Sequence, residues 1–287
     1  RWVLSPGLRY ERIDLTRSNY STATGLRDVV LSRVDTGVDA LIPGFGATFL
    51  ATDDLAVFAS LHRGFNPPGP GADAEPEESI NLEFGLRYDR GVLSAELVGF
   101  VNDYSNLVGT CTASTGGNCT IGDQFDGGDA RVQGLEASLA YTFGGDGAVT
   151  YPLSLSYTWT DAGFRNSFSS DFEEWGDVVS GDQLPYLPEH LLHAAVGMQG
   201  ERWRLDLAGN YIGEMRTEAG QGAVPADKRV KAVVLWELAA AYRVNGQFEF
   251  YGRIENLLDK TYVTARRPAG LRPGLPRTAM FGVRYTF

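Results

Sequence analysis

Apolar and polar residues alternate with a period of two along most of the chain, which is the pattern of β-strands with one face in an apolar environment. In the clearest segment, Ile80, Leu82 and Phe84 share one face, while Asn81 and Glu83 share the other. The same pattern predicts twelve strands, near residues 2–17, 38–51, 55–63, 80–90, 92–105, 130–143, 149–161, 190–199, 202–213, 233–243, 247–256 and 277–287. Several reach about ten residues or more, which is long for a soluble sheet and suits a tilted strand that crosses a bilayer.

The connections between these strands alternate strictly between short and long. Turns of about two to four residues follow every second strand, for example Thr52–Asp54. The other connections are long and rich in Gly, Pro, Asp and Ser: 18–37, 64–79, 106–129, 162–189, 214–232 and 257–276. All the long loops therefore emerge at one edge of the sheet, as in outer-membrane barrels with short periplasmic turns and long extracellular loops. A β-sandwich has no reason to segregate its loops in this way. The sequence predicts an all-β, transmembrane antiparallel up-and-down β-barrel.

Aromatic residues and charge support this interpretation. Aromatic residues on the apolar face lie mostly near strand ends, as expected for the aromatic girdles of a membrane barrel. They are Tyr10, Tyr88, Tyr141, Tyr157, Trp159, Trp203, Tyr211, Tyr242 and Tyr285. The alternative is that strands are rich in aromatic residues in general. The net charge of −11 argues against a nucleic-acid partner, which would need a basic face. No window approaches the roughly 18 apolar residues of a spanning helix.

The two cysteines, Cys111 and Cys119, enclose a short segment that contains Gly116 and Gly117. This spacing predicts a disulfide that closes an exposed loop in an oxidising compartment. The alternatives are two unpaired thiols or half of a metal site. No histidine lies nearby, so we expect no metal there.

Three segments resemble a known protein family, which is more specific information than the alternation of apolar and polar residues provides. PEESINLEFGLRYDRG (76–91) resembles the P-E-x-S-x-N-x-E-x-G-x-R-Y strand of TonB-dependent receptors, and HRGFNPP (62–68) resembles the strand end and loop before it. RIENLLDKTYVTARRPAGLRPGLPRTAMFGVRYTF (253–287) resembles the closing hairpin of that family. The apolar residues of the last strand, Phe281, Val283, Tyr285 and Phe287, resemble the C-terminal signal that outer-membrane barrels present to the barrel assembly machinery.

The resemblance implies a receptor in the bacterial outer membrane that imports a scarce nutrient, usually a ferric siderophore or ferric citrate and sometimes cobalamin or haem. No covalent chemistry and no resident cofactor are implied, because iron arrives as a chelate. The implied partners are the ferric chelate, the TonB energy-coupling complex acting through a plug domain, and outer-membrane lipid with lipopolysaccharide.

Such receptors have 22 strands around an N-terminal plug, and the sequence predicts about twelve strands and neither plug nor coupling box. We therefore expect residues 1–287 to be the C-terminal portion of a receptor barrel. The alternative is a complete twelve-stranded barrel that acts as a phospholipase-like enzyme or a porin. No G-x-S-x-G motif or other nucleophile arrangement is recognisable, so no catalytic residue is predicted.

The candidate ligand residues lie in the loops. Guanidinium groups bind carboxylates bidentately, so the basic loop residues could hold an anionic chelate: Arg229, Arg266, Arg267 and Arg272. These cations could instead pair with lipopolysaccharide phosphates or with the acidic loop at 171–177. Arg253 and Arg284 are predicted to point into the lumen and to pair with Glu249, with Glu255 or with the plug domain of the family.

Trp175 could contact an apolar or catecholate ligand, or it could pin its loop to a neighbouring loop. His62 or His190 could serve a haem ligand, although a structural role is the commoner one for a histidine of this kind. His190 and His193 point to opposite faces of a strand and cannot clamp a metal together.

Overall fold

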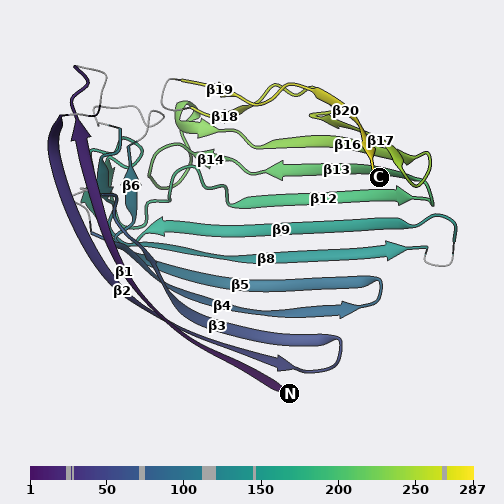
Figure 1. The fold of residues 1–287 in the computed structure, drawn as a ribbon, viewed down its shortest axis with the longest axis horizontal. Coiled ribbons are helices and arrows are strands. Elements are labelled where there is room, and N and C mark those ends of the chain that lie inside the picture. Colours follow the sequence, from purple (N-terminus) through teal and green to yellow (C-terminus); the bar gives the residue numbers. More distant parts are fainter. Residues whose placement is uncertain (24–26, 28, 71–74, 112–120, 145–146, 267–269) are drawn as a thin grey trace.

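A computed structural model describes residues 1–23, 27, 29–70, 75–111, 121–144, 147–266 and 270–287. They form one twelve-stranded antiparallel sheet whose strands are neighbours in chain order (Figure 1). The strands are β1 (Trp2–Tyr20), β2 (Val30–Leu50), β3 (Leu55–Asn66), β4 (Glu77–Arg90), β5 (Leu93–Ser105), β8 (Ala130–Phe143), β9 (Tyr151–Phe164), β12 (His190–Gln199), β13 (Trp203–Ile212), β16 (Val233–Arg243), β17 (Phe248–Glu255) and β20 (Thr278–Tyr285). The structure confirms all twelve predicted strands, with the long loops at one end and the short turns at the other.

The largest difference from the prediction lies in the first hairpin, where β1 and β2 run well into the segment that was expected to be a loop. Pairing continues as far as Tyr20 opposite Val30, with a register shift after Asn19. This stretch is too polar to be read as a strand from alternation, but cross-strand polar contacts hold it. For example, the Asn19 side-chain amide donates to Ser32 Oγ at 2.8 Å. The added length of the hairpin is therefore polar, and it extends beyond the part of the sheet that carries the apolar face.

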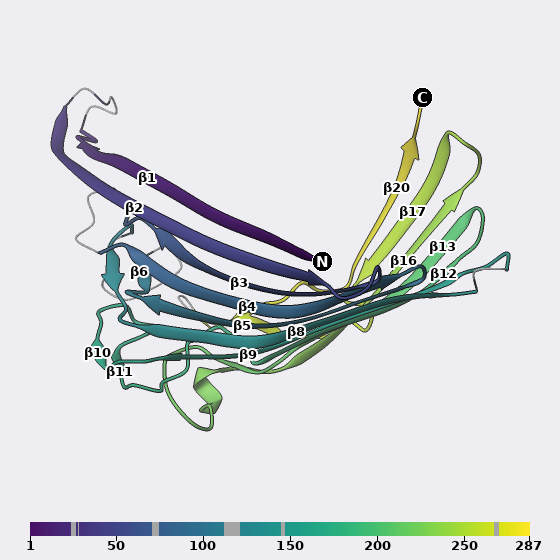
Figure 2. The same cartoon turned by 90° about the horizontal axis from the view of Figure 1, so that it is seen from below.

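The sheet curves into an open trough, and β1 and β20 are its two edges (Figure 2). A sealed twelve-stranded barrel would require β1 to pair with β20, and this pairing is not part of the sheet order. The one helix in the described ranges, η1 (Ala226–Lys228), is three residues long, so no described helix has the length and apolarity to cross a membrane.

Strand register separates the side chains into two faces, because residues directly opposite each other share a face. On one face Leu61 lies opposite Leu82, and on the other His62 lies opposite Asn81. We call the apolar face outer and the polar face inner, since the polar residues line the cavities of the trough. Outer residues such as Phe84 and Val57 remain exposed. No described protein segment covers this face, which is the arrangement that suits contact with lipid.

Aromatic rings of both faces lie across glycines of the neighbouring strand. A Cβ built on Gly134 of β8 would come within 2.7 Å of the Phe100 ring on the inner face. On the outer face, a Cβ on Gly99 would come within 2.6 Å of the Phe84 ring. These glycines provide the space in which the ring can lie flat on the adjacent strand, which pins the register.

The buried hydrophobic core lies in the loops rather than in the wall. Four short hairpins form there: β6–β7 (Val108–Thr110, Gln124–Asp126), β10–β11 (Phe168–Ser169, Asp177–Val178), β14–β15 (Met215–Arg216, Arg229–Val230) and β18–β19 (Val263–Ala265, Arg272–Pro273). Ala130, Phe164, Phe172, Trp175 and Val178 form one buried cluster at the loop end. The loops therefore pack as a small globular layer above the sheet.

Candidate ligand-binding site

Trp175 joins loop 162–189 to loop 106–129. Its indole is 8% exposed and packs edge-on against Phe164 and Phe172. The indole also lies against the β6–β7 hairpin so closely that a Cβ on Gly127 would come within 2.3 Å of the ring. Trp175 was a candidate ligand contact, and its geometry fits the alternative in which it pins one loop to its neighbour.

Hydrogen bonds also join loop 64–79 to loop 106–129. The amide of Gly69 donates to the Gln124 side chain at 2.6 Å, and the Asn106 side chain donates to the Glu75 carbonyl at 2.8 Å. The amide of Val108 donates to Glu77 Oε2 at 3.1 Å. Three consecutive loops are thus tied together.

Arg216 ties loop 162–189 to loop 214–232. It is 5% exposed, and its Nε donates to Gln183 at 3.0 Å while an Nη donates to the Gly222 carbonyl at 3.0 Å. Burial lowers the pKa of this guanidinium from its ordinary value, and the negative charge of Asp182 opposes that shift. A buried cation with hydrogen bonds to two segments has a structural role, because it holds those segments in a fixed position relative to each other.

Hydrogen bonds of one side chain, Asn256, close loop 257–276 at its base, which the sequence did not reveal. Asn256 adopts a positive φ of 47° and is buried. Its amide donates to the carbonyls of Lys260 and Leu275 at 2.8 and 3.0 Å, and its Oδ1 accepts from the Lys260 amide at 2.9 Å. This side chain holds both ends of loop 257–276 together.

The basic loop residues are largely engaged with carboxylates or carbonyls. Arg229 forms an ion pair with Glu214 at 3.3 Å, and the Arg266 Nε donates to the Arg229 carbonyl, which brings two candidates together. Arg272 lies exposed in β19, where it pairs with Ala265, the residue before Arg266. Arg267 lies outside the described residues. Ligand contact stays a prediction for all four.

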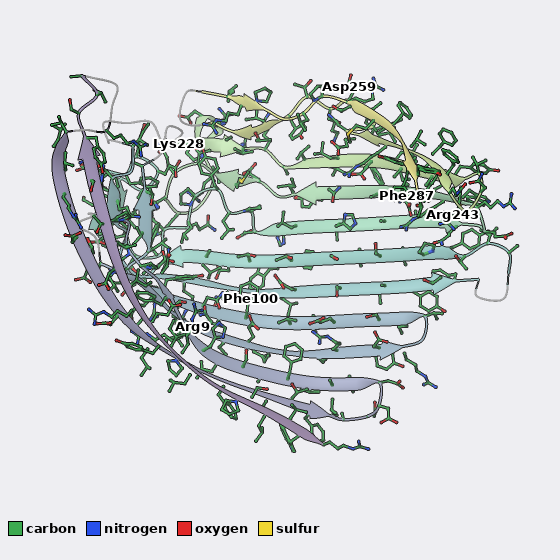
Figure 3. The ribbon with its side chains drawn as sticks, in the orientation of Figure 1. Arg9, Phe100, Lys228, Arg243, Asp259 and Phe287 are labelled. Carbon is green, nitrogen blue, oxygen red and sulfur yellow. The ribbon has the colours of Figure 1, made fainter. Side chains whose placement is uncertain are left out.

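Other loop cations also have carboxylate partners. Lys228 pairs with Glu218, and Arg277 with Asp259 at 3.4 Å. Figure 3 shows Lys228 at the loop end of the sheet, whereas Arg243 lies at the turn end.

The inner wall over β13 to β20 carries ion pairs. Arg253 pairs with Glu237 at 2.7 Å and with Glu255 at 3.2 Å, and Arg284 pairs with Glu249 at 2.8 Å. The predicted lumenal pairing of both arginines is confirmed. These charges satisfy one another across neighbouring strands.

The inner wall over β3 to β5 differs, because a cavity of about 300 Å³ opens there. It is lined by His62, Phe65, Asn66, Glu77, Glu78, Ser79, Asn81, Glu83, Asn102 and Tyr104. His62 is thus placed on the inner face, in a polar cavity near the loop end of the wall. No group of three or more described His, Cys, Asp or Glu residues has the geometry to hold a metal ion. Alternation placed Asn81 and Glu83 on the polar face, but only the register assembles them with His62.

The remaining predicted residues lie away from this cavity. Cys111 is buried, but Cys119 lies outside the described residues, so the disulfide stays a prediction. Phe281, Val283 and Tyr285 share the outer face of β20, and Phe287 follows the strand. All four are exposed, with Phe281 at 81%. Their role as an assembly signal stays a prediction.

Comparison with known proteins identifies the fold. The model of the family "TonB dependent receptor-like, beta-barrel" matches residues 1–257. The chain is 26% identical over 223 residues to the vitamin B12 transporter BtuB of Photobacterium profundum, covering 74% of this chain and 33% of that protein. It is 22% identical over 287 residues to the ferric enterobactin receptor of Pseudomonas aeruginosa, covering 94% and 37%. The chain thus spans about a third of these relatives' length.

Solved structures show the same fold. The ferric-catecholate import receptor Fiu of E. coli K12 superposes with a TM-score of 0.72 at 21% identity, over 100% of this chain and 42% of Fiu. The ferric citrate transporter FecA superposes with a TM-score of 0.72 at 22% identity, over 99% and 42%. The family match places the chain in the outer membrane, and the open sheet with its polar face and long loops fits that place. The chain belongs to the TonB-dependent receptor-like β-barrel family.

Proposed function

We propose that this chain is the C-terminal portion of the barrel of a receptor that takes up a ferric siderophore or ferric citrate. In this proposal a plug domain fills the trough, and the TonB complex supplies the energy through that plug. The observation that carries the proposal is the match over residues 1–257 to the receptor barrel family, together with relatives named for ferric enterobactin and catecholate siderophores.

The loops fit a ligand-capturing role for a physical reason. Binding is stronger when the binding surface is ordered beforehand, because less conformational entropy is lost on association. The contacts of Trp175, Gln124 and Arg216 join four loops to one another at the loop end of the sheet. Arg272 is exposed on the last loop and has no ion pair with the described residues, so it is the candidate best placed to meet an anionic chelate.

Uptake of radioactive iron by cells that make the full-length receptor tests the proposal. The host should lack its own siderophore receptors, and ⁵⁵Fe should be supplied as ferric enterobactin, ferric citrate or a ferric hydroxamate. We expect accumulation of at least one chelate, and its loss in a host without TonB. Relatives named for vitamin B12 and copper define the competing outcome. Uptake of labelled cobalamin or copper with no iron chelate accumulated would contradict the proposal.

A further inference from the structure

Four consecutive loops are joined to one another by contacts that this chain supplies by itself. We call them the loop block: 64–79, 106–129, 162–189 and 214–232. Both partners of each contact described below belong to this chain, so a plug domain or further strands of a full receptor add contacts to the block without supplying these. The arrangement of the loop block is therefore a property of this part of the barrel.

Side-chain packing joins three of the four loops in one hydrophobic core. Leu107 and Phe125 come from loop 106–129, Phe172 and Trp175 from loop 162–189, and Ala219 from loop 214–232. The ring centroids of Phe125 and Phe172 lie 6.1 Å apart across the boundary between two loops. Because protein cores are closely packed, one loop moves away from this core only by exposing the apolar surface of the others.

Backbone hydrogen bonds hold the last two loops of the block to each other and to the wall. The amide of Ala219 donates to the Glu174 carbonyl at 2.9 Å, and the amide of Gln183 donates to the Gly220 carbonyl at 2.9 Å. Gln183 also forms a β-bridge with Gly163, the residue before the last one of β9. These two loops therefore separate, or leave the end of β9, only when backbone hydrogen bonds break.

Hydrogen bonds also join the first three loops of the block. The amide of Arg165 donates to the Asp129 carbonyl at 2.8 Å, and the amide of Asp129 donates to Asn166 Oδ1 at 2.9 Å. The amide of Glu75 donates to Asp126 Oδ1 at 3.2 Å. With the bond between Gly69 and Gln124 described above, these contacts connect loop 64–79 to the core through loop 106–129.

We propose that the loop block is one cooperative unit, in which the four loops open and close together rather than one at a time. All amides of such a unit exchange through the same opening, so a substitution that destabilises one part accelerates exchange in every part by the same factor. The inference goes beyond the proposed function, because it holds for any transported nutrient. A ligand that displaces one of these loops has to displace all four.

Amide hydrogen exchange of the purified full-length receptor, without any ligand, tests the inference. Trp175→Ala removes the ring at the centre of the core and should accelerate exchange at least about a hundredfold. The factor should be the same, within about threefold, in all four loops. Loop 64–79 is the decisive part, because the amides of Gly69 and Glu75 bond to loop 106–129 and not to the Trp175 ring.

Arg216→Met is the reciprocal test, and it also serves if Trp175→Ala does not fold. This substitution removes the hydrogen bonds of Arg216 to Gln183 and to the Gly222 carbonyl. Exchange should accelerate in loop 106–129 by the same factor as in loop 214–232.

Asn256→Ala is the matched control, because it also removes hydrogen bonds of a buried side chain, but at the base of loop 257–276. It should accelerate exchange in loop 257–276 and leave the loop block unchanged. Acceleration confined to the loops that the substituted side chain touches would overturn the inference, and so would acceleration of the block by Asn256→Ala. The proposed function would stand in both cases, because the uptake of iron tests it separately.

Discussion

The loop layer and the wall of this protein are stabilised in opposite ways. The loop layer buries Trp175 and Phe164 against one another, as a soluble domain does. The wall buries almost no large apolar residue, and Trp236 and Trp159 on its outer face are 38% and 39% exposed. The loops therefore bring their own hydrophobic core, whereas the wall needs lipid to cover its apolar face. Substitutions in the two regions should consequently respond to different conditions.

Trp175→Ala should have the largest effect, and it should be local. Removing a buried Trp costs about 3–5 kcal/mol, because apolar contacts are lost and a cavity remains. We expect amide hydrogen exchange in loops 106–129 and 162–189 to accelerate at least about a hundredfold in the full-length receptor, while the amides of β8 and β9 stay protected. Equal acceleration in loops and wall would contradict a separate loop core.

Leu207→Arg tests the outer face. Leu207 lies midway along β13 on that face, and an Arg on the lipid side at the bilayer midplane costs about 2–4 kcal/mol. Urea titration of the receptor in lipid vesicles should show this loss. Ala208→Arg is the control, since Ala208 lies on the inner face opposite Glu237 and should lose far less. A larger loss for Ala208→Arg would reverse the assignment of faces.

Gly127→Ala tests whether the contact between Trp175 and Gly127 holds loops 106–129 and 162–189 together. The added Cβ would lie 2.3 Å from the Trp175 ring, and such overpacking costs about 1–3 kcal/mol. Limited proteolysis should cut the loops faster than in the parent. Gly122→Ala is a matched control for a loop glycine with open space around it, although its positive φ of 94° adds backbone strain. If Gly127→Ala is cut no faster than the parent, the contact between the loops is not the brace described here.

Glu249→Gln should have the smallest effect. Its carboxylate pairs with Arg284 on the inner face, but the Arg284 side chain is two-thirds exposed, and water-exposed ion pairs contribute about 0.2–1 kcal/mol. The urea midpoint should hardly change at physiological salt. A loss above about 2 kcal/mol would mean that this wall pair is far more shielded than its exposure indicates.

The sequence predicted the strands well because period-two alternation is a local property of each strand. It predicted the pairing of Arg253 with Glu255 for the same reason, since both lie on one face two residues apart. The loop core could not be predicted, because Trp175 meets Gly109 and Gly127 across many residues of chain and no periodic signal links them. The polar β1–β2 extension was missed because its stability comes from cross-strand pairs such as Asn19 with Ser32.

The candidate site was predicted only in part. His62 was selected as a lumen-facing or loop histidine that could serve a haem ligand, but its neighbours Asn81 and Asn102 come from two other strands and are fixed by register. The arginines were selected by charge alone, and charge alone does not reveal that Arg229 and Arg266 are occupied by Glu214 and by a backbone carbonyl.

The most direct test of the central claim, that the wall faces lipid while the loops form their own core, is tryptophan quenching by brominated phospholipids. Full-length receptors that retain a single tryptophan should be reconstituted into such lipids. The fluorescence of Trp159 and Trp236 should be strongly quenched, and that of Trp175 should not. Quenching of Trp175 together with protection of the two wall tryptophans would contradict the account.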